Sequence, residues 1–275
     1  MANKAVKDVN AEKSLTVAED IEMRSGKAHF LLTSRDEIEQ NNIVSGVIGT
    51  AWVVVSGSGS RRIARVAGLG LHDHAEPMAV ADALDFGWDA GAAVAEVRTL
   101  SHTLGTTLGQ DLQSLGFTVL RTHCHWFRDI SEEKIELPLH TVVEISQRES
   151  EEFAKIIAVN YHLPKNTSLE KYIKLVGSPG EGCFLAYLND EPAGTGRVFV
   201  SDDACVLGYG TTQKQYRKQG VQRSMINARL HWAKRQGALC AASSTYGQDR
   251  SSRNLVRCGF VKAGSIITYG IKRDH

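Results

Sequence analysis

Residues 210–225 read GTTQKQYRKQGVQRSM. They contain a basic loop with a glycine, followed by the start of an amphipathic segment. The predicted strand before the loop and helix after it place the loop at a helix N-terminus, where the first backbone N–H groups lack partners. Those groups and the helix dipole attract phosphate oxygens, and Arg217, Lys218 and Arg223 add positive charge. Gly220 lets a ligand approach the backbone closely. The segment predicts an anion site suited to a diphosphate; a solvated basic helix start is the alternative that these residues leave open.

Two motifs in this part of the chain resemble those of a known enzyme superfamily. Arg217-x-x-Gly220-x-Gln222 resembles the Arg/Gln-x-x-Gly-x-Gly/Ala signature of the GNAT superfamily of acyl-CoA-dependent N-acetyltransferases, in the form of a subgroup with glutamine at the last position. Residues 251–260, SSRNLVRCGF, are similar to that subgroup's second signature, Ser-x-Arg-Asn-x-x-Arg-x-Gly-Phe. The resemblance covers residues 150–275. It implies a mixed sheet whose fourth and fifth strands separate to admit the pantetheine arm of coenzyme A.

The resemblance also implies which residues hold acetyl-CoA. The loop would bind the pyrophosphate, the end of the preceding strand would offer hydrogen bonds to pantetheine, and two side chains of the later helix would complete the site. The predicted cofactor-binding residues are Gly210, Thr211, Thr212, Arg217, Lys218, Gln219, Gly220, Val221, Gln222, Arg223, Asn254 and Arg257.

The catalytic groups are harder to assign, because the sequence departs from the family pattern in two places. Some GNAT enzymes have a glutamate early in strand four, where this chain has Cys-Val-Leu at 205–207. Many members have a tyrosine acid where this chain has Leu255. Tyr246, just past the predicted fifth strand, is therefore the predicted proton donor, with an exposed loop tyrosine as the alternative. The general base is unassigned.

A repeated ending indicates two copies of one α/β unit. Residues 112–117, LQSLGF, and residues 255–260, LVRCGF, lie 143 residues apart, and in each a helix would end at glycine before a strand begins. The predicted fold class is α/β (α+β), with two GNAT-like domains, each a mixed twisted sheet flanked by helices, at 1–145 and 146–275. In the first domain the counterpart of the anion loop, residues 72–77, has no Arg-x-x-Gly and contains carboxylates. That domain is predicted to be degenerate, without a cofactor site.

Composition and charge exclude several classes of protein. Lysine and arginine number 32 against 31 acidic residues, so the +1 net charge gives no general attraction to nucleic acid or to anionic membranes. The longest apolar run, residues 43–55, is shorter than the roughly 20 residues that a membrane-spanning helix needs. Because it is rich in β-branched residues, it is expected to form a strand. Five scattered cysteines indicate free thiols in a reducing cytoplasm, and the polar first twenty residues contain no secretion signal.

Two histidine pairs could contribute metal ligands. His123 and His125 would share one face of a strand, and His72 and His74 lie in a predicted loop. Neither pair supplies a complete ligand set, so no metal is predicted.

The sequence as a whole predicts an acetyl-CoA-dependent N-acetyltransferase. Acetyl-CoA would be the co-substrate, and a primary amine of a small molecule would attack the thioester directly. No nucleic-acid or membrane partner is expected, and the protein would be a cytoplasmic monomer or homodimer. A non-catalytic acyl-CoA-binding sensor and a protein-modifying acetyltransferase are the alternatives.

Overall fold

The computed structural model describes residues 2–69, 71, 77–100, 108–132, 134–247 and 249–273. The first helix, α1, is 30 residues long and was not predicted from the sequence. In chain order the helices and strands are α1 (Ala2–Leu31), α2 (Arg35–Gln40), β1 (Val44–Ile48), β2 (Ala51–Ser56), β3 (Ile63–Ala67), α3 (Pro77–Asp89), β4 (Val94–Leu100), α4 (Leu108–Ser114), β5 (Thr118–Asp129), β6 (Val142–Glu144), α5 (Ser150–Asn160), α6 (Glu170–Lys174), β7 (Glu181–Leu188), β8 (Glu191–Ser201), β9 (Ala204–Thr212), α7 (Val221–Arg235), β10 (Cys240–Thr245), α8 (Arg250–Arg257) and β11 (Val261–Lys272).

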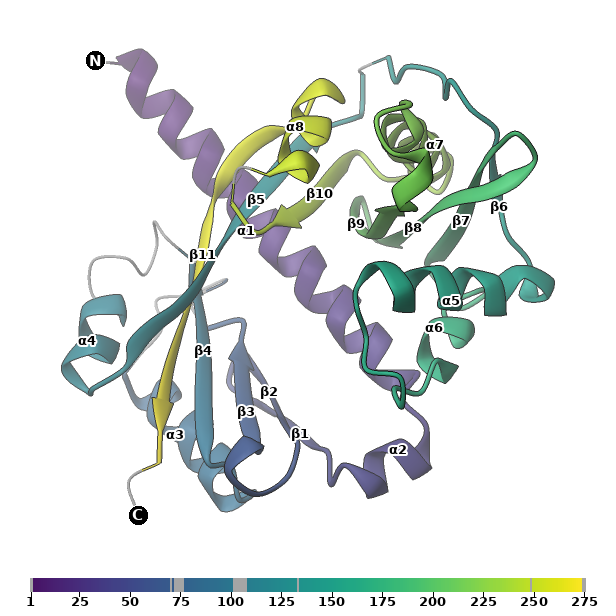
Figure 1. The fold of residues 1–275 in the computed structure, drawn as a ribbon. Coiled ribbons are helices and arrows are strands. Elements are labelled where there is room, and N and C mark those ends of the chain that lie inside the picture. Colours follow the sequence, from purple (N-terminus) through teal and green to yellow (C-terminus); the bar gives the residue numbers. More distant parts are fainter. Residues whose placement is uncertain are drawn as a thin grey trace.

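All the strands belong to one mixed sheet, in the order β1-β2-β3-β4-β11-β5-β10-β9-β8-β7-β6. Two neighbouring pairs, β3–β4 and β9–β10, are parallel, and the others are antiparallel. Helix α1 crosses the middle of this sheet and contacts strands of both halves (Figure 1). None of the described helices is both long and apolar enough to cross a bilayer.

The two halves of the chain exchange strands at the centre of the sheet. Strand β11, from the end of the chain, lies between β4 and β5, and β5 lies between β11 and β10 (Figure 1). Their antiparallel register is symmetric: Thr118 pairs with Gly270, and Phe127 pairs with Val261. Both strands begin and end 143 residues apart, the offset of the sequence repeat. The β5–β11 pair therefore relates the two halves by a local two-fold axis.

Finer features of the repeat obey the same symmetry. Each strand has one unpaired bulge residue, Leu120 in β5 and Ala263 in β11, again 143 positions apart. Gly116 and Gly259, which follow α4 and α8, both adopt the left-handed backbone conformation, with φ of +87° and +78°. The predicted helix ends at these two glycines are confirmed.

Other expectations are modified by the structure. Residues 43–55 are not one strand: β1 and β2 form a hairpin that turns at Gly49, where φ is +58°. The domain division at 145 and 146 stays a prediction, since the exchanged strands join both halves in one sheet. Residues 72–76, most of the counterpart of the anion loop, lie outside the described part of the chain.

The exchanged strand should couple the stability of the two halves. Ile266 of β11 is fully buried with Leu15 of α1 and Leu100 of β4. Ile266→Ala should lower the free energy of unfolding by about 2–5 kcal/mol, because it leaves a cavity in the core. Urea denaturation should show a single transition, shifted to a lower urea concentration. As a control, Val261→Ala, at an exposed position of the same strand, should cost less than about 1 kcal/mol. Two transitions, only one of them shifted, would contradict this coupling.

Candidate functional site

Strands β9 and β10 separate soon after they meet. Their parallel pairing covers only three residue pairs and ends where Val206 faces Ala242. Beyond that point the Ser243 hydroxyl donates to the Leu207 carbonyl at 3.3 Å, while β9 continues to Thr212 and β10 pairs only with β5. The separation that the resemblance implied is therefore present.

A bulge in β9 marks the place where the strands part. The register with β8 shifts here, and Tyr209 takes a φ of +45°. The guanidinium of Arg229, on α7, lies buried behind the bulge and donates to the carbonyls of Arg197 and Gly208, at 3.0 Å each. Burial lowers the pKa of Arg229 to about 10, and no described carboxylate pairs with it. Arg229 thus gives a buried hydrogen-bond donor to two backbone oxygens beside the bulge.

The loop after β9 leads into the N-terminus of α7. Gly220 caps the helix with a φ of +82°, and Lys218 is also left-handed at +66°. No side chain caps α7, so the first-turn N–H groups remain available to a ligand. The Thr212 hydroxyl donates to Gln222 Oε1 at 3.3 Å, and Arg217 Nε donates to the Thr212 carbonyl at 3.2 Å. These bonds fix the loop against the end of β9.

A pocket of about 680 Å³ lies between this loop, the end of β9 and α8. All the predicted cofactor-binding residues line it except Gln219, whose side chain donates back to Gln215 at 3.4 Å. The lining residues are Leu139, Gly210, Thr211, Thr212, Tyr216, Arg217, Lys218, Gly220, Val221, Gln222, Arg223, Arg250, Ser251, Arg253, Asn254 and Arg257.

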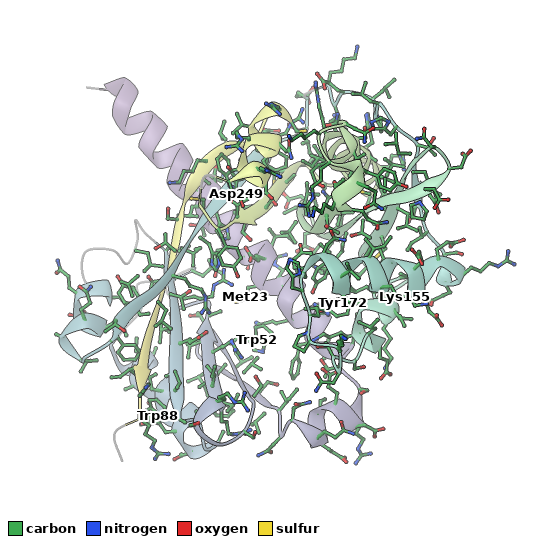
Figure 2. The ribbon with its side chains drawn as sticks, viewed as in Figure 1. Met23, Trp52, Trp88, Lys155, Tyr172 and Asp249 are labelled. Carbon is green, nitrogen blue, oxygen red and sulfur yellow. The ribbon has the colours of Figure 1, made fainter. Side chains whose placement is uncertain are left out.

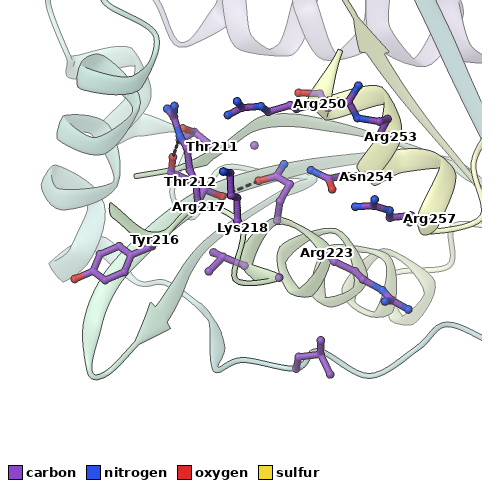
Figure 3. A pocket seen from close by; sticks show the side chains of 16 residues that line it. Thr211, Thr212, Tyr216, Arg217, Lys218, Arg223, Arg250, Arg253, Asn254 and Arg257 are labelled. Carbon is purple, nitrogen blue, oxygen red and sulfur yellow. Dashed lines mark hydrogen bonds between the residues drawn. The ribbon is translucent and has the colours of Figure 1, made fainter. Parts of the chain in front are cut away.

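The pocket lining is strongly cationic. Six of its side chains are lysine or arginine and none is a carboxylate. Figure 3 shows Arg250, Arg253 and Arg257 of α8 opposite Arg217 and Lys218 of the loop. Arg250 and Arg253 were not predicted, although both lie in or beside the second signature. The arrangement can hold a ligand with several phosphate groups between two helices.

Tyr246 does not line this pocket. It follows β10, its side chain is 75% exposed, and its ring packs edge-on against His123 at 4.3 Å between centroids. Cys205, in the stretch 205–207 where some GNAT enzymes have a glutamate, is buried, which raises the pKa of its thiol and keeps it protonated. The role of Tyr246 as proton donor stays a prediction.

One group of described side chains has the spacing of metal ligands. Glu19 and Glu22 of α1 and His125 of β5 place one ligand atom each within 4.8 Å of the others. Arg98 already donates to Glu19 at 2.9 Å and lies 3.7 Å from Glu22. Burial raises the pKa of Glu19 to about 7. The group therefore balances much of its charge internally, and the absence of a metal stays a prediction; His72 and His74 lie outside the described residues.

Comparisons with known proteins indicate which family the part of the chain around this pocket resembles. Residues 139–260 match the profile of the Acetyltransferase (GNAT) family. Residues 139–260, which contain the loop, α7 and α8, are therefore similar to the GNAT acetyltransferases, a family that takes its acyl group from acetyl-CoA. A search of the curated proteins gave no match.

Solved structures with a similar fold include GCN5-related N-acetyltransferases and a tandem GNAT protein. A GCN5-related N-acetyltransferase from Kribbella flavida is 18% identical, with a TM-score of 0.60 over 90% of this chain and 96% of that one. A GCN5-related N-acetyltransferase from Sphaerobacter thermophilus is 12% identical, with a TM-score of 0.61 over 81% and 76%. A tandem GNAT protein from the clavulanic acid biosynthesis pathway is 12% identical, with a TM-score of 0.60 over 81% and 79%.

A half-buried histidine beside β9 predicts one contribution to the pH dependence of stability. His29 of α1 lies 3.0 Å from the Tyr209 hydroxyl, and burial, aided by Arg197 and Lys171, lowers its pKa from 6.5 to about 4. The unfolded chain therefore binds a proton between pH 6.5 and 4 that the folded chain does not. The contribution of His29 to stability is full above pH 6.5 and falls below it, by up to about 3 kcal/mol at pH 4.

Urea denaturation between pH 7 and 4 measures this effect. His29→Gln should flatten the pH dependence, whereas replacement of the exposed His162 by asparagine should leave it unchanged. Equal slopes for the wild type and the His29 variant would show that His29 is not the group responsible.

Proposed function

We propose that the pocket between β9 and α8 binds acetyl-CoA. The observation that carries the proposal is a cationic pocket without carboxylates, which begins at the uncapped N-terminus of α7 and continues along the separated end of β9. The pyrophosphate would lie against the N–H groups of residues 221–223. The pantetheine arm would pass between β9 and β10, beside the backbone of Gly210, Thr211 and Thr212.

The reaction we propose is acetyl transfer to a primary amine of a small molecule. The neutral amine nitrogen attacks the thioester carbonyl, the carbon–sulfur bond breaks, the amine loses one proton and the coenzyme A thiolate gains one. An amine of pKa about 10.4 needs about 4.6 kcal/mol to reach its neutral form at pH 7, so a base or water relay is required. Tyr246 is our proposed donor to the thiolate.

The N-terminal half would support this site without a cofactor of its own. We propose that residues 1–145 form the degenerate unit and 146–275 the catalytic one, in a cytoplasmic monomer or homodimer. All five cysteines are free thiols, which fits a reducing compartment.

A non-catalytic acyl-CoA sensor is the second candidate. It is favoured by two observations: Cys205 stands where a strand-four carboxylate would be, and Leu255, where many members have tyrosine, is buried in the core. Such a protein would bind the same ligand and release no thiol.

Calorimetry followed by a thiol-release assay separates these functions. Acetyl-CoA should bind the wild type, and Arg217→Glu should weaken binding at least tenfold, because it removes one cation and adds a negative charge beside the diphosphate. Arg235→Glu, an exposed charge reversal at the other end of α7, is the matched control and should bind normally. Equal affinity for both variants would contradict the site, and binding without thiol release across an amine panel would favour the sensor.

A further inference from the structure

A second, smaller pocket lies between the two halves of the protein. It has a volume of about 310 Å³, at the lower end of the range for small-molecule sites. Figure 2 shows Trp52 on the side of the first-half strands and Tyr172 on the side of α5 and α6. The pocket is lined by Gly26, His29, Phe30, Thr33, Trp52, Val54, Arg65, Val66, Ala67, Arg98 and Lys171.

The second pocket lies on the α1 face of the sheet, and α7 covers the opposite face. Along β9, Val206 packs in the same cluster as Ile21 of α1, whereas its neighbours Cys205 and Leu207 pack with Met225 of α7. Because successive strand residues point to opposite faces, α1 and α7 lie on opposite sides of β9. A chain threaded between β9 and β10 from the cationic pocket would emerge on the α1 face.

Two side chains that line the second pocket, His29 and Arg98, connect it to the separating strands, although no residue of β9 or β10 lines it. On one side, His29 contacts the hydroxyl of Tyr209 in β9 at 3.0 Å. On the other side, Arg98 lies 3.7 Å from Glu22, and the Ser244 hydroxyl of β10 donates to Glu22 at 3.3 Å. The pocket is therefore separated from the gap between β9 and β10 by the side chains of His29, Arg98 and Glu22.

The lining determines what such an acceptor can be. Arg65, Arg98 and Lys171 supply three cations, and the lining contains no carboxylate. Two buried nitrogens in the wall, Arg98 Nε and His29 Nε2, have no hydrogen-bond partner. These groups fit an anionic group on the ligand. The rings of Trp52 and Phe30, edge-to-face at 5.9 Å, fit an apolar or aromatic body.

The charged side chains around the second pocket restrict further which ligand it can bind. The nearby carboxylates are Glu19, Glu22, Glu37 and Glu96, and the nearby cations are Arg65, Arg98, Arg121 and Lys171. These four negative and four positive charges nearly cancel. A zwitterionic ligand would leave the net charge of the region unchanged, whereas a polyamine would add several positive charges. Glu22 is within 3.7 Å of Arg98, so an ammonium and a carboxylate on adjacent atoms of one ligand can each face an opposite charge.

We propose that this pocket is the acceptor site and that it takes an α-amino acid with an apolar or aromatic side chain. The inference rests on the proposed function of the cationic pocket. The amino group would face Glu22 and Ser244 at the strand opening, the carboxylate would face Arg98 and Lys171, and the side chain would lie against Trp52. The amino group is then acetylated by the reaction given above, with no further reactant.

Steady-state acetylation of three acceptors tests the proposal: phenylalanine, phenethylamine, which lacks the carboxylate, and spermidine, a polyamine. The wild type should prefer phenylalanine by at least tenfold in kcat/KM. Lys171→Gln should reduce kcat/KM for phenylalanine about tenfold and leave phenethylamine and the KM for acetyl-CoA unchanged. Lys174→Gln, on the same helix but outside the pocket, is the control and should behave as the wild type. Preference for phenethylamine or spermidine, or equal effects of the two variants, would overturn the proposal.

A binding measurement without turnover separates this inference from the proposed function. Phenylalanine, added with saturating coenzyme A, should change the tryptophan fluorescence of the wild type, and Trp52→Phe should abolish that change. A fluorescence change without any binding of acetyl-CoA would refute the proposed function and leave the amino-acid pocket standing. Acetyl-CoA binding and amine acetylation without a phenylalanine signal would refute the pocket and leave the proposed function standing.

Discussion

The separation of β9 from β10 is the constraint on which the rest of the site depends. Two parallel strands that part after three residue pairs leave backbone groups without ladder partners, and such groups are costly unless they are satisfied. The buried guanidinium of Arg229 donates to the Gly208 carbonyl of β9 and to the Arg197 carbonyl of β8, and the Ser243 hydroxyl of β10 donates to the Leu207 carbonyl of β9. The opening is therefore a stable feature of the fold.

Beyond the point where β9 and β10 separate, β10 is paired only with a strand from the first half of the chain. Strand β5 pairs with β10 as far as Thr245, and the exchanged strand β11 fastens β5 to β4. Helix α1 then covers the other face of the opening with Glu22 and His29. The first half can thus contribute to the site through its strands and its first helix. The site belongs to both halves, although its cationic lining comes from the second.

Local sequence was enough to predict the cationic pocket, because its parts follow one another along the chain. A strand, a basic loop with Gly220 and a helix start occupy residues 204–225, and Asn254 and Arg257 belong to a second compact motif. The two glycines that follow α4 and α8 could be predicted for the same reason. Glycine adopts the left-handed conformation at a helix end because of its own lack of a side chain.

Long-range features could not be predicted in this way. Helix α1 begins with a polar, mixed-charge run, and its contacts with strands of both halves depend on the folded sheet. Arg229 is a mid-helix arginine that would ordinarily face solvent, and only the bulge in β9 gives it buried acceptors. The hairpin at Gly49 was read as one strand, because the residues on both sides of the turn are equally β-branched. The pairing of β5 with β11 joins residues far apart in the chain. The repeat predicted two similar units but not that these two strands pair with each other.

Amide hydrogen exchange with and without saturating acetyl-CoA tests the central claim most directly. If the coenzyme lies against the N-terminus of α7 and between the separated strands, exchange should slow at residues 221–223 and 210–212 and stay unchanged in β1–β3. Saturating binding that leaves both segments unprotected, or that protects the first-half strands instead, would contradict the account.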